Sequence, residues 1–465
     1  MKTEKISKAL NWIMIALFSV LIAIGPLLAV FEKRELLFPF MGGLVLAAGI
    51  YFILPLIRVK KVHPTILTII LSVLCFIVKF IWIYMVRIEP MVDYQTYFDY
   101  AKTLSESFSA PNNYIALFPH VFGYSWFLSF FMKIFGTGEL LAPVINVIFS
   151  VISGVLIFRI AYRLIDIRAA VFAYLLWIFC PSQTIYNSLV LSDLFYTTMI
   201  LAFVLIITEM NLSSCVKHTA LLGVLAGFIL RLVNITRPIA AILIIAVIIW
   251  LGVLKAKEWT NSDFRKKWSP FLILLVICYF VTEPIWDIYT EKRLGEKPAG
   301  APGYNVMVGF NMDSYGAWNA EDSALLVEYS QAPDATAVST QEQMLKDAKE
   351  RITSGTINFP KLFANKFVTF LGYDSSAVFY HLDVLNDSVK SLENLSNIFY
   401  YMLVILAVIA SPALGKQTAI STVPLYVIGL TIAQMLVEVA GRYHYSIIPM
   451  LILAAQFGIF RKAKE

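Results

Sequence analysis

The sequence predicts an all-α polytopic membrane protein, and its composition and patterning support this class. Hydrophobic residues make up 59% of the 465 residues, only 15% are charged, and the mean hydropathy is +0.74. Long apolar runs, separated by short basic or proline-containing breaks, recur along most of the chain. Soluble globular proteins do not have this composition, because polar side chains must cover much of their surface.

A membrane-spanning helix needs about 20 consecutive apolar residues, and the chain offers about twelve such runs. They fall at 8–30, 36–57, 65–86, 139–160, 168–183, 189–209, 217–233, 236–254, 268–286, 396–411, 418–438 and 444–460. Pro181 breaks one nearly continuous apolar run, and Arg237 with Pro238 breaks another. We therefore expect a bundle of about twelve transmembrane helices.

Basic residues in short connections indicate how the bundle is oriented. In a twelve-span arrangement most of them fall on one side, for example Lys5, Arg159, Arg163, Lys257 and Lys266. The positive-inside rule makes that side cytoplasmic. The net charge of +6 therefore reflects topology, and it does not indicate nucleic-acid binding.

This orientation places two long segments, 87–138 and 287–395, on the extracytoplasmic side. The expected division is an N-terminal transmembrane module at 1–286 that includes the first outer loop, an extracytoplasmic cap at 287–395, and C-terminal transmembrane helices at 396–465. Within the cap, helices are expected at 319–330, with Asn319 as N-cap, and at 340–353. The same segment contains the glycine-rich strip GYNVMVGFNMDSYGAWNAED.

The first outer loop opens with an amphipathic stretch at 88–108. Its apolar side recurs at helical spacing at Val92, Tyr94, Tyr97, Phe98, Ala101, Leu104 and Phe108. We expect a helix in the membrane interface with Asp93 near its start, followed by a second interfacial or re-entrant helix entered through Pro119 and Gly123. A carboxylate at the edge of hydrocarbon is costly and points to function. Asp93 could equally cap the helix.

Four ionisable residues distant in sequence are expected at the same membrane level. They are Asp93, Asp193 at the start of the sixth span, Arg237 between the seventh and eighth, and Arg442 between the last two. Two arginines can grip a phosphate by forked hydrogen bonds, and a nearby carboxylate can deprotonate an acceptor hydroxyl. The set favours group transfer from a lipid-linked phosphate donor.

Each of these residues also has a simpler interpretation. Asp193 could cap its helix, Arg237 could snorkel to the interface, and Arg442 could pair with Glu438 one helical turn away. Arg231 could share the phosphate or merely pair with a carboxylate. Among the histidines, His381 and His444 could be purely structural. The joint placement, rather than any single residue, supports the functional hypothesis.

These residues resemble the GT-C class of membrane glycosyltransferases, in particular the family 39-type bacterial enzymes related to protein O-mannosyltransferase and aminoarabinose transferase. Matches to the family pattern run in order along most of the chain: Asp93 with Tyr97 and Ala101, Pro119 with Gly123 and Phe135–Gly136, Pro181 through Asp193, Arg237–Pro238, and Arg442–Tyr443 with Pro449. The glycine-rich strip is similar to one in Gram-positive members. Many relatives have two adjacent acids in the first loop, whereas Tyr94 follows Asp93 here.

The resemblance implies a GT-C-like fold and an inverting transfer from a polyprenyl-phosphate sugar. Asp93 would be the catalytic base and Asp193 a supporting acid. Arg237, Arg442 and Arg231 are candidates for the donor phosphate, and Tyr94, Tyr97, Tyr443 and His444 for the sugar or the acceptor. No cofactor is certain, and a divalent metal is left open because the second acid is missing from the first loop.

The function expected from the sequence is therefore a glycosyltransferase of the bacterial plasma membrane, multi-pass, with its active site on the extracytoplasmic face. The donor would be an undecaprenyl-phosphate sugar and the acceptor a cell-envelope polymer or glycolipid. One alternative is a transporter or flippase of polyprenyl-linked glycans, which needs binding groups but no base. The other is a structural subunit without chemistry.

Overall fold

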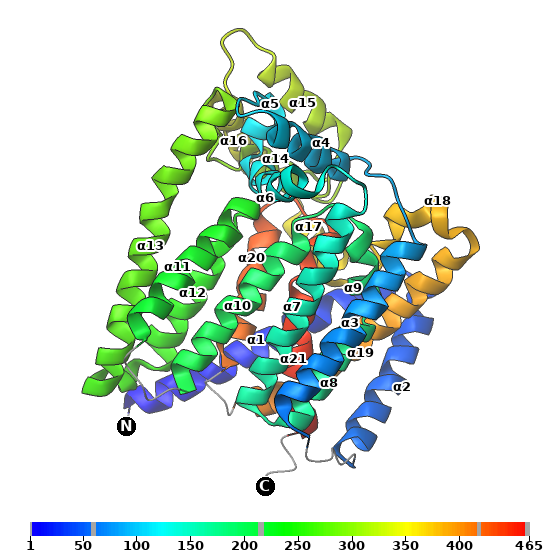
Figure 1. The fold of residues 1–465 in the computed structure, drawn as a ribbon, viewed down its shortest axis with the longest axis vertical. Helices are drawn as coiled ribbons and strands as arrows, with labels where there is room; N and C mark the ends of the chain where they lie inside the picture. Colours follow the sequence, from blue (N-terminus) through cyan, green and yellow to red (C-terminus); the bar gives the residue numbers. More distant parts are fainter. Residues whose placement is uncertain (1, 57–61, 213–217, 416–419, 461–465) are drawn as a thin grey trace.

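In the computed structural model, the described residues, 2–56, 62–212, 218–415 and 420–460, form helices joined by loops and contain no β-strand. The longer helices pack into a bundle, a layer of shorter helices covers one end, and both termini lie at the opposite end (Figure 1). The predicted class, an all-α polytopic membrane protein, is confirmed.

Each predicted apolar range contains a helix. They are α1 (Lys2–Glu32), α2 (Leu37–Ile53), α3 (Pro64–Met85), α7 (Leu141–Leu164), α8 (Ile167–Phe179), α10 (Asp193–Leu212), α11 (Thr219–Thr236), α12 (Ala240–Ile249), α13 (Ser262–Leu294), α19 (Val389–Leu414), α20 (Thr422–Leu436) and α21 (Ile447–Phe460). Among the described residues, eight helices are long and apolar enough to cross a membrane. The number of twelve spans stays a prediction.

The remaining ranges hold shorter or bent helices. α8 and the segment Pro181–Ser188, which begins with α9 (Pro181–Ile185), form a pair bent by 61°, at the break predicted for Pro181. The apolar helices at the positions of α12, α20 and α21 are shorter than 18 residues. Such interrupted segments are where a membrane protein can place backbone and polar side chains at membrane depth.

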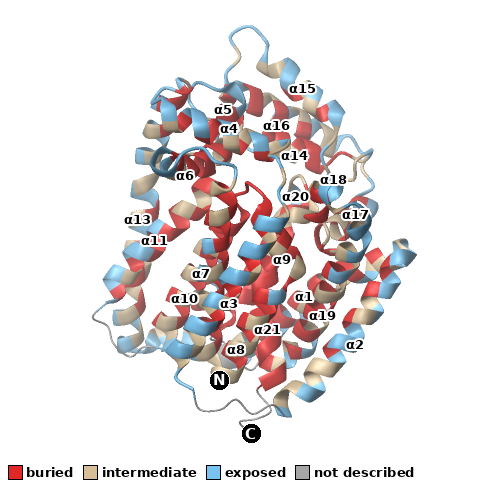
Figure 2. Ribbon diagram, turned by 45° about the vertical axis from the view of Figure 1, so that its right-hand side comes forward, coloured by how far each residue is buried: buried red, intermediate tan, exposed pale blue. Residues whose placement is uncertain are grey.

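Helices at the rim of the bundle expose large apolar side chains. On α2, Phe38 is 68% exposed and Val45 is 67% exposed, and Ile285 on α13 is 64% exposed. Figure 2 shows buried residues concentrated inside the bundle and exposed residues along these outer helices. A soluble monomer rarely carries so much apolar surface, whereas lipid requires it.

A layer of six helices, which we call the cap layer, covers one end of the bundle. It consists of α4 (Asp93–Glu106), α5 (Asn113–Leu117), α6 (Pro119–Phe135), α14 (Gly303–Gly309), α15 (Ala320–Ser330) and α16 (Ala337–Thr353). Gln341 joins its two halves, because its side-chain oxygen accepts from the Tyr304 N–H at 2.8 Å and its amide donates to the Leu117 carbonyl at 3.2 Å. Arg293 at the end of α13 donates to the Leu104 carbonyl at 3.2 Å.

The amphipathic helix predicted in the first outer loop is confirmed as α4. Its buried face includes Tyr94, Tyr97 and Leu104. Val92 and Phe108, which were expected on the apolar side of this helix, lie just outside it and are 72% and 61% exposed. The predicted second helix is α6, which begins at Pro119.

The segment 287–395 does not form one separate unit. α15 follows the N-cap Asn319 as predicted, and the helix predicted at 340–353 is part of α16. However, α13 continues to Leu294, so the predicted boundary after residue 286 falls inside a helix. The remaining helices are α17 (Phe359–Leu371), which packs against α1, and the short α18 (Leu382–Leu385).

Lys366 on α17 connects the cap layer to the end of α20. Its side chain is fully buried, and its ammonium donates to the carbonyls of Gly309 at 2.9 Å, Met435 at 3.0 Å and Val437 at 2.6 Å. These carbonyls belong to the C-terminal ends of α14 and α20, which lack partners within their own helices. Three donors therefore satisfy three acceptors, and the positive charge lies where both helix dipoles favour it.

We expect Lys366→Met to lower the free energy of unfolding by about 3 kcal/mol or more, because three buried carbonyls lose their partner. Thermal unfolding in detergent would measure the loss. Lys361→Met is the matched control, since this lysine is exposed on the same helix and contacts only the Tyr315 ring. Equal melting temperatures for the two variants would contradict the role assigned to Lys366.

Candidate active site

The candidate site residues lie at the ends of helices, beneath the cap layer. Asp93 is the first residue of α4, Asp193 is the first residue of α10, and Arg237 is the C-cap of α11. Arg442 and Tyr443 lie in a short 3₁₀ turn within residues 437–446, which connect α20 to α21 and which we call the α20–α21 link. Side chains at helix ends can enter a common space without disrupting helix packing.

Asp93 and Arg442 form an ion pair although 349 positions separate them in the chain. The Nη2 atom of Arg442 donates to Oδ2 of Asp93 at 2.6 Å, and the two side chains are 15% and 41% exposed. The N-cap of α4 is Val92 rather than Asp93, so the simpler interpretation of Asp93 as a helix cap is wrong. Nor does Glu438 pair with Arg442 within 4 Å among the described residues.

The backbone immediately before Asp93 is strained. Val92 has φ 52° and ψ −125°, a conformation that β-branched residues rarely adopt. Such strain persists only where surrounding contacts hold it, and it clusters at functional sites. The Asp93 carboxylate is held by its ion pair at one end of this turn, so its direction is fixed by both backbone and side chain.

The two arginines meet on one aromatic ring. The guanidinium carbon of Arg237 lies 4.0 Å from the centre of the Tyr443 ring, and that of Arg442 lies 5.6 Å from it. Within the described part of the chain, Arg237 makes no side-chain hydrogen bond or ion pair, so its donors are available to a ligand. Two guanidinium groups on one ring, with one set of donors unused, suit an anion with several acceptor oxygens.

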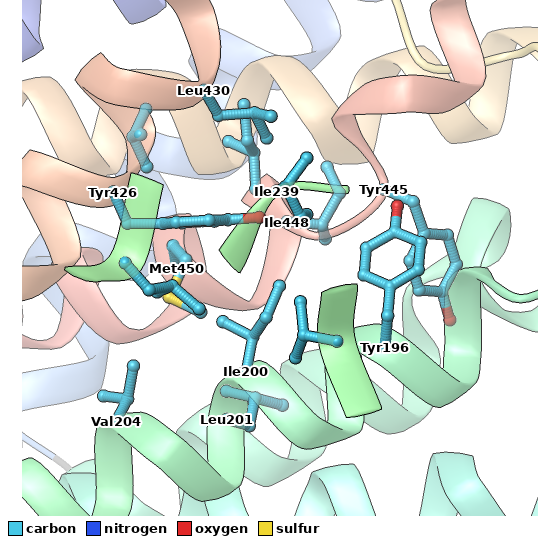
Figure 3. Packing of buried hydrophobic residues seen from close by; sticks show 14 of the residues in the cluster. Tyr196, Ile200, Leu201, Val204, Ile239, Tyr426, Leu430, Tyr445, Ile448 and Met450 are labelled. Carbon is cyan, nitrogen blue, oxygen red and sulfur yellow. The ribbon is translucent and has the colours of Figure 1, made fainter. Parts of the chain in front are cut away.

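Asp193 lies at the bottom of the same region and is only 2% exposed. Its Oδ1 accepts a hydrogen bond from the Tyr196 hydroxyl at 3.0 Å, and its charge acts on Arg237. Figure 3 shows Tyr196 beside Tyr445, within a closely packed set of aromatic and aliphatic side chains from several helices. The negative charge of Asp193, which lies among these closely packed side chains, therefore stabilises the positive charge of Arg237.

Two of the predicted site residues make other contacts. Arg231 forms an ion pair with Glu283 at 3.3 Å and donates to the Tyr279 carbonyl at 2.6 Å, both on α13. His444 is 1% exposed, and its two ring nitrogens contact the Phe370 carbonyl and Asp374. Both ring nitrogens of His444 are therefore engaged, whereas Arg231 is engaged through Nη2 and its buried Nε has no partner among the described residues.

The predicted tyrosines differ in their access to the site. Tyr94 and Tyr97 are 1% and 5% exposed, so they form the wall behind Asp93 more than a contact surface. Burial raises the pKa of Tyr97 to about 12, which keeps its hydroxyl protonated. Tyr443 is half-buried and carries both arginines on its ring.

His120 is a site residue that sequence reasoning missed. It lies one turn before Gly123, where α6 approaches α11 so closely that a Cβ would lie 1.9 Å from the Ile235 carbonyl oxygen. This approach brings His120 beside Arg237. Burial, together with the charges of Arg237 and Arg442, lowers the pKa of His120 to about 3, and the charge of Asp93 opposes the shift. The Pro119–Gly123 spacing was the available signal, but it was interpreted only as the entry to a second interfacial or re-entrant helix.

Glu438 is the second missed residue, because the i, i+4 spacing suggested only a pair with Arg442. Burial raises the pKa of the Glu438 carboxyl, and the charges of Arg442, Arg237 and Lys366 oppose this effect. Its position is set by the glycine-rich strip. The Glu438 N–H donates to the Asn305 carbonyl at 2.6 Å.

The glycine-rich strip is a brace for the α20–α21 link. The Val439 N–H donates to the Gly316 carbonyl at 2.9 Å, and Gly309 lies against Val437 so closely that a Cβ would be 2.5 Å from its carbonyl carbon. The strip is itself held by Asp322, which is 1% exposed. Asp322 accepts hydrogen bonds from Arg351, Asn319 and Asn311 at 2.8 to 3.0 Å. Burial alone would raise the pKa of Asp322, but these hydrogen bonds hold it below its ordinary value.

The side chains around Asp93 do not form an evident metal site. In the described ranges, no group of three or more His, Cys, Asp or Glu residues is placed to hold one ion. Asp93 is engaged by Arg442, and Asp193 by Tyr196. The donor set fits an anionic ligand better than a divalent cation, so no step of the reaction is assigned to a metal.

Comparison with known proteins gave one family match and a remote structural similarity. Residues 119–286 match the model of the dolichyl-phosphate-mannose-protein mannosyltransferases. Among solved structures, ArnT from Cupriavidus metallidurans in the apo state is 12% identical, with a TM-score of 0.37 over 85% of this chain and 78% of that chain. No match was found among the curated proteins.

The matched range runs from α6 to α13 and contains Asp193 and Arg237, whereas Asp93 and Arg442 lie outside it. The structural similarity is too remote to support an argument about mechanism. The family match confirms the resemblance predicted from the sequence: over residues 119–286 the chain is similar to the dolichyl-phosphate-mannose-protein mannosyltransferases, a family of GT-C membrane glycosyltransferases.

Proposed function

We propose that the protein is a membrane glycosyltransferase that moves a sugar from a polyprenyl-phosphate donor, such as an undecaprenyl-phosphate sugar, to a hydroxyl of a cell-envelope polymer or glycolipid. The observation that supports this most is the convergence of Asp93, Arg442 and Arg237 around Tyr443. A base and two phosphate-binding cations from three distant parts of the chain are the minimum set for this reaction.

The location of the site fits a lipid-linked donor. The convergent residues lie between the cap layer and the bundle, and the rim helices expose apolar side chains along their length. A polyprenyl tail can therefore stay in the bilayer while its phosphate reaches Arg237 and Arg442. The positive-inside rule puts the cap layer on the extracytoplasmic face of the plasma membrane.

In the proposed reaction, Asp93 accepts the proton of the acceptor hydroxyl, and the hydroxyl oxygen forms a bond to the anomeric carbon of the sugar. The bond from that carbon to the phosphate oxygen breaks on the opposite face, so the configuration inverts. Polyprenyl phosphate leaves with one more negative charge, which Arg237 and Arg442 stabilise as it develops. Asp193 keeps Arg237 charged and oriented.

The ion pair between Asp93 and Arg442 fits this sequence of events. A donor phosphate offers Arg442 several acceptor oxygens, so it competes with the single carboxylate oxygen that the arginine contacts at 2.6 Å. Transfer of Arg442 to the phosphate releases Asp93 for the acceptor. The donor then binds before the base becomes available to the acceptor.

The first test is Asp93→Asn. We expect this variant to bind the donor at least as well as the unmodified protein, because Arg442 is released, and to lose turnover by about 10²-fold or more. Release of polyprenyl phosphate from a polyprenyl-phosphate sugar and acceptor extract measures turnover. Full glycosylation by the variant would exclude Asp93 as the base. Unimpaired lipid transport across vesicles without transfer would favour the flippase alternative.

The second test compares two arginines of α11. Arg237→Ala should weaken binding of polyprenyl phosphate by roughly tenfold or more, because its unused donors are the proposed phosphate contacts. Arg231→Ala should leave the affinity unchanged, since this arginine is engaged by Glu283. Both are measured by titration with the lipid phosphate in detergent. If only Arg231→Ala weakened binding, the assignment of the two residues would have to be exchanged.

The third test concerns pH. With its pKa lowered to about 3, His120 carries no charge in the range in which the ordinary histidine, with a pKa of about 6.5, titrates. We expect the pH profile of turnover to have the same shape in the unmodified protein and in His120→Asn. A titration near neutral pH that disappears in His120→Asn would show that this histidine is protonated during the reaction.

A further inference from the structure

The side chain of Glu438 makes no interaction with the described residues that would stabilise the fold. The residue lies in the α20–α21 link, where Val437 and Ala440 have extended backbone, with φ −133° and −141°. Its side chain is half-buried and makes no hydrogen bond or ion pair with any residue that the structure describes. A carboxylate that is withdrawn from water without a hydrogen-bond partner is unfavourable. A bound ligand would supply the missing partner.

The cations that surround Glu438 are engaged elsewhere. Arg442 pairs with Asp93, Lys366 donates to three backbone carbonyls, and Arg237 lies over the Tyr443 ring. Each acts on Glu438 through its charge, yet none lies within 4 Å of it. The oxygens of the Glu438 carboxyl group therefore remain free to accept hydrogen bonds from a ligand.

The neighbours of Glu438 include aromatic side chains. Its charge acts on Tyr443 and on Tyr304, whose hydroxyl is fixed by Ser323 at 2.8 Å and whose ring meets Phe118 with centres 5.5 Å apart. A carboxylate can accept hydrogen bonds from two hydroxyls at once, and ring faces cover the C–H surface of a sugar. These groups together suit a polyhydroxylated ligand better than a second phosphate.

The backbone of Glu438 is held independently of its side chain. Its N–H is bound by the Asn305 carbonyl, the next residue is bound by Gly316, and Lys366 holds the start of the link through Val437. Replacing the side chain therefore leaves the link in place. The side chain extends from the same link as Arg442, whose charge acts on it.

We propose that Glu438 binds hydroxyl groups of the donor sugar and so makes the site select glycosylated lipid over bare polyprenyl phosphate. This inference rests on the proposed function. It assigns the two arginines to the phosphate and Glu438 to the sugar, and it adds a specificity-determining residue for which the sequence suggested only an ion pair. The sugar hydroxyls replace the missing partner of the carboxylate, and ring faces cover the rest.

The experiment measures two affinities for each variant of the full chain in detergent. The probes are bare polyprenyl phosphate and polyprenyl phosphates carrying mannose, glucose, N-acetylglucosamine or arabinose, of which the sugar that binds tightest is used. Glu438→Gln should weaken binding of the glycosylated lipid by roughly tenfold or more and leave binding of the bare phosphate unchanged. Arg237→Ala should weaken both lipids equally. Glu328→Gln, an exposed change on α15, is the control.

The outcomes separate this inference from the proposed function. If the unmodified chain binds neither bare polyprenyl phosphate nor any of the glycosylated forms, the proposed function itself fails. If the unmodified chain binds no glycosylated form more tightly than bare polyprenyl phosphate, Glu438 does not select the sugar. The same conclusion follows if Glu438→Gln weakens the binding of both lipids or of neither. Thermal unfolding verifies that the variant folds. If Glu438→Gln does not fold, Glu438→Asp takes its place, because it keeps the carboxyl group but shortens the side chain by one methylene. This variant must then weaken binding of the glycosylated lipid and leave binding of the bare phosphate unchanged.

Discussion

The site depends on a constraint that applies to any interrupted helix in an apolar bundle: the backbone groups of the interruption need partners. The α20–α21 link meets this requirement with groups from three other elements. Lys366 of α17 binds the carbonyls of Met435 and Val437, and carbonyls of the glycine-rich strip bind the next two N–H groups. Once the backbone is satisfied in this way, the side chains of the link are free for chemistry.

This arrangement explains why the cap layer is part of the site rather than a cover over it. Gly309 lies against Val437 of the link, Gly316 packs against Gly309 and Lys366, and Asp322 holds the strip through hydrogen bonds. On the other side, Gly123 allows α6 to contact the end of α11 beside Arg237. Three contacts at which only glycine fits therefore determine how far the arginines lie from the first outer loop. A shift of this layer would separate Asp93 from Arg442.

The sequence was sufficient for the fold class and for the convergence of Asp93, Arg237 and Arg442, because hydropathy and loop charge determine which residues reach the same membrane level. It was not sufficient for His444 or Arg231, since a motif position does not reveal whether a side chain is satisfied by a backbone carbonyl or by a glutamate on another helix. Glu438 was hidden for the opposite reason. Its i, i+4 spacing from Arg442 suggested a helical pair, but the link is not helical there, and Arg442 pairs with Asp93.

The link divides its residues between two tasks. Val439 and His444 are buried and hold the segment through hydrogen bonds, whereas Glu438, Arg442 and Tyr443 are half-buried. Backbone contacts to the strip do not depend on the identity of those three side chains. A site built in this way can change its ligand by side-chain substitution without loss of its framework. Arg442 is the least replaceable of the set, because its loss would leave the Asp93 carboxylate on α4 unpaired.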